Sequence, residues 1–70
     1  QYLVVVEAGP TSFGAYVPDL PGCVAAGETR AEALALIREA IEFDIEGLKQ
    51  SGQAVPMPSS TSQIIDIHAA

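Results

Sequence analysis

Apolar and polar positions divide the chain into three short strand-like segments, one long helix-like segment and a final apolar segment. Residues 1–7 form the first, and their apolar side chains fall on both alternating faces. This pattern is typical of a central strand that is buried on both sides. Residues 12–17 and 23–27 form the next two. Gly9 and Pro10 lie in the first connection and predict an antiparallel hairpin.

The connection between the second and third segments is rich in turn-forming residues. Pro18 has no N–H to donate and therefore ends the pairing of the second strand. Pro21 supplies a fixed φ, and Gly22 tolerates a positive one. We expect a rigid structural turn formed by Pro18, Pro21, Gly22 and Cys23, with Asp19 bonding its own nearby backbone.

A helix is predicted to begin after Thr29. Thr29 and Glu32 have the spacing of a capping box, in which the Thr29 hydroxyl accepts a hydrogen bond from a free N–H of the first helical turn and the Glu32 side chain accepts one from the N–H of Thr29 itself. Apolar residues then recur every three or four positions and line one face of the helix. These residues are Ala33, Leu34, Ile37, Ala40, Ile41, Ile45 and Leu48.

The helix is predicted to end near Gly52, with Lys49 placed favourably at the negative end of the helix dipole. Its length would be roughly 20 residues, or about 30 Å. Gly47 lies inside it and costs about 1 kcal/mol relative to alanine. Close approach to another backbone is one reason for a glycine there.

The final apolar segment is predicted to be a fourth strand. Residues 54–62 are rich in proline and serine, and residues 63–68 contain three isoleucines. A right-handed crossover through the helix would bring this strand back parallel to the first. The order β-β-β-α-β then gives an α+β fold, with a four-stranded mixed sheet and one helix on one face. The opposite face would be apolar and uncovered, which marks an interaction site.

The composition favours self-association. A chain of 70 residues is one small domain, which buries too little surface to be more than marginally stable. The chain has a single cysteine, Cys23, so no internal disulfide can form, and no cysteine–histidine cluster suggests a structural zinc. Because 49% of the residues are hydrophobic, we expect a homo-oligomer.

The charge narrows the choice of partners. The formal net charge is −6, so a direct nucleic-acid partner is excluded and a basic protein is favoured. No apolar stretch approaches the ~20 residues that span a bilayer, and the N-terminus lacks the pattern of a signal peptide. We therefore expect no membrane partner, and the single free cysteine favours the cytoplasm.

Several motifs together resemble the HicB-type antitoxins of bacterial toxin–antitoxin pairs, and more narrowly the small HicB-like proteins that consist of the N-terminal domain alone. They are Tyr2 with its apolar strand, residues 13–16, residues 17–23, residues 27–33 and residues 55–59. The resemblance implies a partial ribonuclease-H-like fold. It also implies a partner, a small basic mRNA-cleaving toxin of HicA type, whose active site the antitoxin covers.

Full-length HicB antitoxins usually carry a C-terminal ribbon-helix-helix or helix-turn-helix domain that binds the operator. We expect residues 1–70 to be a single HicB-like domain with no C-terminal DNA-binding domain. Autorepression by this chain alone is therefore not predicted.

Enzymatic alternatives are weak. A ribonuclease-H-like nuclease needs several carboxylates converging on divalent ions. Cys23 lacks a nearby base, because the single histidine, His68, lies close to the C-terminus. We expect no catalytic residues, no metal and no cofactor; the carboxylates considered for a metal site are Glu7, Asp19, Glu28 and Asp66.

The predicted function is that of an antitoxin-like protein that binds and neutralises its toxin. The candidate partner-binding residues are Asp19 and Leu20 in the turn, and Glu39, Glu42 and Glu46 on the acidic face of the helix. The alternative is a stand-alone oligomeric interaction or regulatory module, which binds another protein or a small ligand and has no toxin partner.

Overall fold

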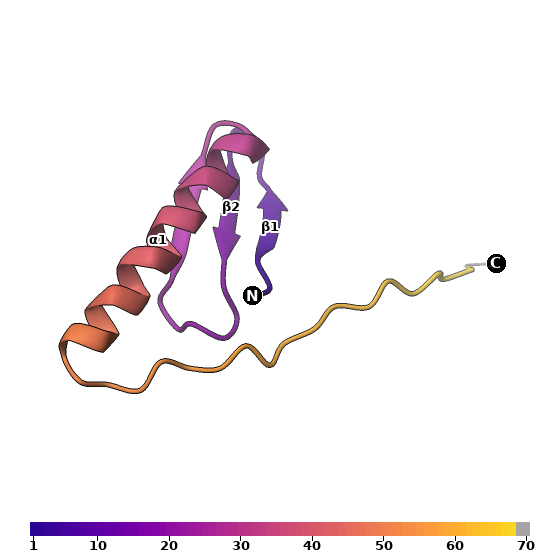
Figure 1. The fold of residues 1–70 in the computed structure, drawn as a ribbon. Coiled ribbons are helices and arrows are strands. Elements are labelled where there is room, and N and C mark those ends of the chain that lie inside the picture. Colours follow the sequence, from indigo (N-terminus) through magenta and orange to yellow (C-terminus); the bar gives the residue numbers. More distant parts are fainter. Residues whose placement is uncertain (69–70) are drawn as a thin grey trace.

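The computed structural model describes residues 1–68 and contains a three-stranded sheet with one helix packed on one face (Figure 1). All neighbouring strands are antiparallel, and their order is β1-β2-β3. The α+β class is confirmed. The elements are β1 Val5–Ala8, β2 Phe13–Tyr16, β3 Val24–Gly27 and α1 Arg30–Gln50.

The strand register separates the two faces of the sheet. Ala15 of β2 lies between Val6 of β1 and Ala25 of β3, and this row packs against α1. Successive side chains of a strand point to opposite faces. The next row therefore lies on the face that α1 does not cover, and it consists of Val5, Tyr16 and Val24.

The hydrophobic core is small and lies between the sheet, the turn after β2 and the first half of α1. Leu20 and Ile37 are its largest fully buried side chains, each 1% exposed. With so few buried side chains, the loss of one removes a large part of the stabilising apolar burial. The fully buried members are Ala15, Val17, Leu20, Cys23, Ala33 and Ile37.

Two consecutive β-turns form the connection between β2 and β3. The Leu20 N–H donates to the Val17 carbonyl at 3.1 Å, and the Cys23 N–H donates to the Leu20 carbonyl at 3.0 Å. Gly22 has a φ of 81°, as the third position of a type II turn requires. The turn that the two prolines and Gly22 predict is therefore present. Its three hydrogen-bonding residues, Val17, Leu20 and Cys23, all point into the core.

The start of α1 is capped nearly as predicted. The Thr29 hydroxyl accepts a hydrogen bond from the Glu32 N–H at 3.0 Å. The Glu32 carboxylate accepts from the N–H of Glu28 at 3.0 Å, one residue earlier than the capping box predicts. The Thr29 hydroxyl thus satisfies a backbone donor that the first turn of the helix leaves free, and the Glu32 carboxylate ties the residue before the cap to that turn.

The end of α1 is a Schellman motif. The Gln53 N–H donates to the Leu48 carbonyl at 2.9 Å, and the Gly52 N–H donates to the Lys49 carbonyl at 3.2 Å. Gly52 has a φ of 72°, so the predicted stop is confirmed. The explanation offered for Gly47 is wrong: a Cβ there would meet nothing within 4 Å.

The predicted fourth strand does not form, so the four-stranded mixed sheet is a wrong prediction. Residues 53–68 contain no helix or strand, and residues 61–68 project away from the domain as an exposed segment (Figure 1). The physical reason lies in the connector: Asp19 holds Ser59 and Ser60 at the turn after β2, and from there the chain runs outward and does not pair with β1. The ribonuclease-H-like comparison depends on that strand and stays a prediction.

Candidate functional site

The C-terminal segment is fastened to the domain by Asp19. The backbone N–H groups of Ser59 and Ser60 donate to Asp19 Oδ2 at 2.9 and 2.8 Å. Their hydroxyls donate to Asp19 Oδ1 at 3.0 and 2.8 Å. The Tyr2 hydroxyl also donates to the Pro56 carbonyl. We call the Asp19, Ser59 and Ser60 group the aspartate clamp. It replaces the local backbone contacts that were predicted for Asp19.

The clamp lowers the pKa of Asp19 from 3.8 to about 2. The backbone N–H of Ser60 is the largest cause, followed by the N–H of Ser59 and then by the hydroxyls. Each of these donors favours the charged carboxylate. The clamp is therefore a structural contact in the folded domain, and a partner role for Asp19 stays a prediction.

Acid is expected to open the clamp. Because the pKa of Asp19 is lower in the folded chain, its contribution to stability is complete above about pH 4 and is lost as the pH falls towards 2. The protection of the Ser59 and Ser60 amides against hydrogen exchange, measured by NMR relative to the intrinsic exchange rate at each pH, should fall across this window. Asp19→Asn should lower this protection already at pH 7, since the amide retains only one acceptor oxygen.

The control for this prediction is Asp66→Asn, which removes an exposed carboxylate that makes none of the hydrogen bonds of the clamp. It should leave the exchange of Ser59 and Ser60 unchanged. Unchanged exchange in Asp19→Asn at pH 7 would contradict the assignment of the clamp.

Leu20 does not belong to an exposed site. It is 1% exposed, so the expectation that it lies exposed at the turn is wrong. The turn geometry is the reason, because its hydrogen bonds direct Leu20 towards Ile37 and the rest of the core. We therefore leave Leu20 out of the contact surface that we propose below.

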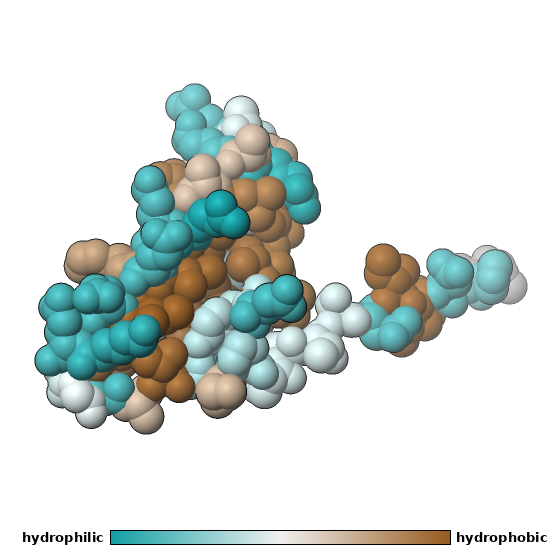
Figure 2. Space-filling view, in the orientation of Figure 1, coloured by the Kyte–Doolittle hydropathy of each residue, from teal (hydrophilic) through white to brown (hydrophobic). Residues whose placement is uncertain are grey.

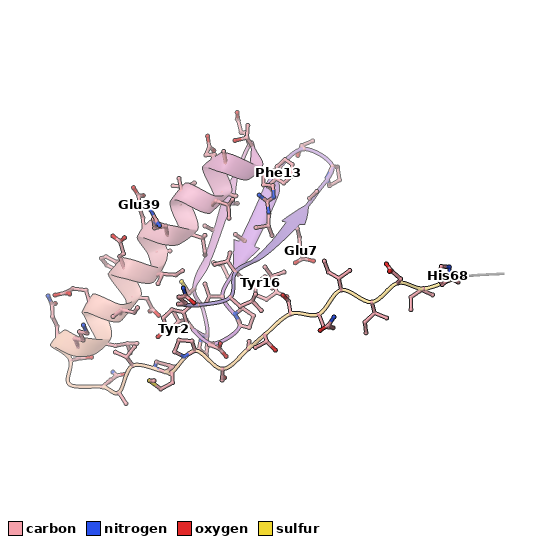
Figure 3. The ribbon with its side chains drawn as sticks, turned by 45° about the vertical axis from the view of Figure 1, so that its right-hand side comes forward. Tyr2, Glu7, Phe13, Tyr16, Glu39 and His68 are labelled. Carbon is pink, nitrogen blue, oxygen red and sulfur yellow. The ribbon has the colours of Figure 1, made fainter. Side chains whose placement is uncertain are left out.

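The outer side of α1 carries an acidic surface with an apolar centre. Figure 3 shows Glu39 pointing away from the strands, and Glu42 and Glu46 are also exposed. Phe43 is 83% exposed among them and Leu36 is 38% exposed. The sequence signal for Phe43 was its position outside the apolar stripe, between acidic residues. We define the acidic helix face as Leu36, Glu39, Glu42, Phe43 and Glu46.

A second apolar surface lies on the side of the sheet that α1 leaves open. Val24 is 65% exposed there and Tyr16 is 40% exposed. Leu3 and Val5 are half-buried. This is the uncovered face that the sequence predicted, although it is assembled from three strands.

The residues considered for catalysis are not brought together. Within residues 1–68, no group of three or more histidine, cysteine or acidic side chains could hold a metal ion. Cys23 is buried, and burial, together with the charge of Asp44, raises the pKa of its thiol. A raised pKa disfavours the thiolate that a nucleophile needs. His68 lies far from it, near the end of the projecting segment (Figure 3).

Among the described residues, no helix combines the length and apolar character needed to cross a membrane.

Two curated proteins are similar in sequence. The UPF0150 protein Ta0767 of Thermoplasma acidophilum is 43% identical over 70 residues, covering 99% of both chains. An uncharacterised 14.9 kDa protein of Haemophilus phage HP1, from the rep–hol intergenic region, is 35% identical over 65 residues. The alignment covers 93% of this chain but 49% of the phage protein, so this chain spans about half of that relative.

Two solved structures share the fold. The N-terminal domain of Burkholderia pseudomallei antitoxin HicB matches with a TM-score of 0.73 and 36% identity, over 83% of this chain and 69% of the other. A chain of the HicA3 and HicB3 toxin–antitoxin complex matches with a TM-score of 0.72 and 32% identity, over 86% and 70%. Residues 2–69 match the family described as HicB_like antitoxin of bacterial toxin-antitoxin system. The chain therefore belongs to the HicB-like antitoxin family.

Proposed function

We propose that this chain binds a small basic mRNA-cleaving toxin of HicA type and neutralises it by covering the toxin's active site. The observation that carries the proposal is the match to a chain of the HicA3 and HicB3 complex, at 32% identity and a TM-score of 0.72. The antitoxin supplies a surface and no chemistry. We assign this binding to residues 2–69, and we assign them no DNA contact and no cofactor.

The acidic helix face is the surface that we propose for the toxin. The chain carries nine acidic and three basic residues, and three of the acids lie on this face. Complementary charge speeds and orients the encounter with a basic protein. Phe43 gives the same face an exposed aromatic anchor, which is the kind of residue that supplies most of the energy of an interface.

The first experiment identifies the toxin. The tagged chain is used to capture partners from its native lysate, and a co-purifying small basic protein is then purified by itself and assayed for mRNA cleavage. The proposal expects cleavage by that protein alone and its loss when an equimolar amount of this chain is added. A captured protein that cleaves no mRNA, or cleavage that persists, would overturn it.

The second experiment locates the surface. Charge reversal of Glu39, Glu42 and Glu46 to lysine should weaken toxin binding on the order of ten-fold or more at low salt, while circular dichroism stays unchanged. Phe43→Ala should weaken binding by a similar factor, independently of salt.

The matched control reverses three other exposed acids, Glu7, Glu28 and Asp66, and gives the same change in net charge. It should retain most of the affinity. Equal effects of the two triple variants would show that only net charge matters and would remove the acidic helix face from the proposal.

The alternative function is a stand-alone interaction module without a toxin. One observation favours it, the exposed apolar side chains of the projecting C-terminal segment. In that case the lysate experiment returns this chain alone as a stable oligomer.

A further inference from the structure

The first strand has the composition of a central strand but lies at an edge. Its approach and first residues, Leu3 to Val6, are apolar on both faces. The sheet order β1-β2-β3 nevertheless leaves one side of β1 without a partner among the described residues. An apolar edge strand is a ready template for another strand, and most proteins protect such an edge with charges or a covering segment. Here Glu7 is the single charged residue of β1.

A groove lies beside the residues that lead into β1. It has a volume of about 780 Å³ and runs between the start of the chain and α1. Gln1, Tyr2 and Val4 line one side. The helix lines the other, with the apolar residues Leu34, Ala35, Ile37 and Ile41 and the charged residues Arg38, Glu39 and Glu42. Glu39 and Glu42 therefore belong both to this groove and to the acidic helix face. The groove exists because α1 packs mainly on β3 and β2 and least on β1. A strand added to the edge of β1 would direct every second side chain into it.

The projecting segment has the features of the missing strand. Ile64, Ile65 and Ile67 are 89%, 71% and 80% exposed, and they form an apolar patch apart from the domain (Figure 2). No hydrogen bond joins residues 61–68 to the rest of the described chain. Eight extended residues span about 26 Å, more than the length of β1. In a strand, Ile65 and Ile67 would share one face, with Asp66 and His68 on the other.

The aspartate clamp sets the direction in which residues 61–68 leave the domain. It holds Ser59 and Ser60 at the turn after β2, and the chain then runs outward, past the N-terminus (Figure 1). The segment therefore leaves the groove of its own domain empty. Each chain thus offers one unpaired strand and one unfilled strand position.

We propose that residues 61–68 add as a strand to the open edge of β1 in a second copy of this chain, with Ile65 and Ile67 filling the groove. When two chains exchange these segments reciprocally, each segment gains a strand to pair with and each groove is filled, in a closed two-fold dimer. A second copy is the occupant because one chain supplies both complementary parts in equal number. This inference goes beyond the toxin-binding proposal and does not depend on it.

The first test is the oligomeric state, measured by sedimentation for the whole chain. The wild type should be a dimer, and Ile65→Asp/Ile67→Asp should be a monomer with an unchanged circular dichroism spectrum. The matched control is Met57→Asp, which replaces another exposed apolar residue, 79% exposed, that precedes the clamp. It should remain dimeric. A monomeric wild type, or a dimer that survives the double substitution, would overturn the proposal.

The second test separates exchange from pairing within one chain. Isotopically labelled and unlabelled chains are mixed, refolded together and analysed for contacts between differently labelled chains by isotope-filtered NMR. The methyl groups of Ile65 and Ile67 should contact Val4 and Leu34 of the other chain. If these contacts occur only in uniformly labelled samples, the segment pairs with its own β1 and the proposal is wrong.

Discussion

Leu20→Ala is expected to destabilise the domain by about 2–5 kcal/mol, because it removes a large side chain from a core with few others. Leu20 is 1% exposed and packs with Ile37, Val17 and Cys23. A single core in a domain below ~70–80 residues rarely supplies more than about 3–5 kcal/mol of stability. Most of the molecules should therefore be unfolded at 37 °C, as thermal denaturation followed by circular dichroism would show.

The control is Leu36→Ala, which removes the same atoms from a side chain that is 38% exposed on α1. Its effect should be smaller than about 1 kcal/mol. Equal losses of stability in the two variants would contradict the placement of Leu20 in the core. The Leu20→Ala result also bears on the binding experiments. Because Leu20→Ala unfolds the domain, a loss of toxin binding in this variant would not show that Leu20 contacts the toxin.

Local sequence signals predicted the local structure of this chain. The two prolines and Gly22 predicted the turn, and Thr29, Glu32 and Gly52 predicted both ends of α1. Each of these signals acts within a few residues, through a fixed φ, a positive φ or a backbone donor left free by the helix. Such signals need no knowledge of the rest of the fold.

Long-range contacts were not predictable in the same way. The aspartate clamp joins residues 40 and 41 positions apart, and the family motif around Pro56 and Ser59 gave no hint that it receives Asp19. The apolar pattern of residues 1–7 predicted a central strand, and this prediction is wrong, because β1 lies at an edge of the three-stranded sheet. The pattern reports how apolar a segment is and not which strands lie beside it.

The acidic residues of the candidate site could be predicted from the sequence, but its exposed apolar residues could not. Glu39, Glu42 and Glu46 are exposed as expected, because they lie off the apolar stripe of α1. Phe43 was not predicted as a site residue, because the search for site residues on the helix followed the acidic positions. Phe43 lies outside the apolar stripe and is exposed, so packing of α1 on the sheet does not explain an aromatic residue there. An apolar residue that lies outside the apolar stripe of a helix is therefore a candidate contact for a partner protein.

Gly27→Ala is expected to cost about 1–3 kcal/mol, because the added methyl group overpacks the contact between β3 and α1. A Cβ at Gly27 would lie 2.7 Å from the backbone nitrogen of Ala33 and 3.0 Å from the side chain of Glu32. The nearest of these atoms is helix backbone, so the first turn of α1 must move away from the sheet. The melting temperature should fall by roughly 4–8 °C for each kcal/mol lost.

The matched control is Gly14→Ala in the neighbouring strand, where a Cβ would meet nothing within 4 Å. Its melting temperature should stay close to that of the wild type. If both alanines are tolerated equally, the helix does not rest on Gly27. If only Gly27→Ala is destabilising, Gly27 has a steric role, because its missing side chain lets the start of α1 pack directly against β3. This contact sets the orientation of α1 on the sheet. The orientation of α1 in turn sets the positions of the acidic helix face and of the groove.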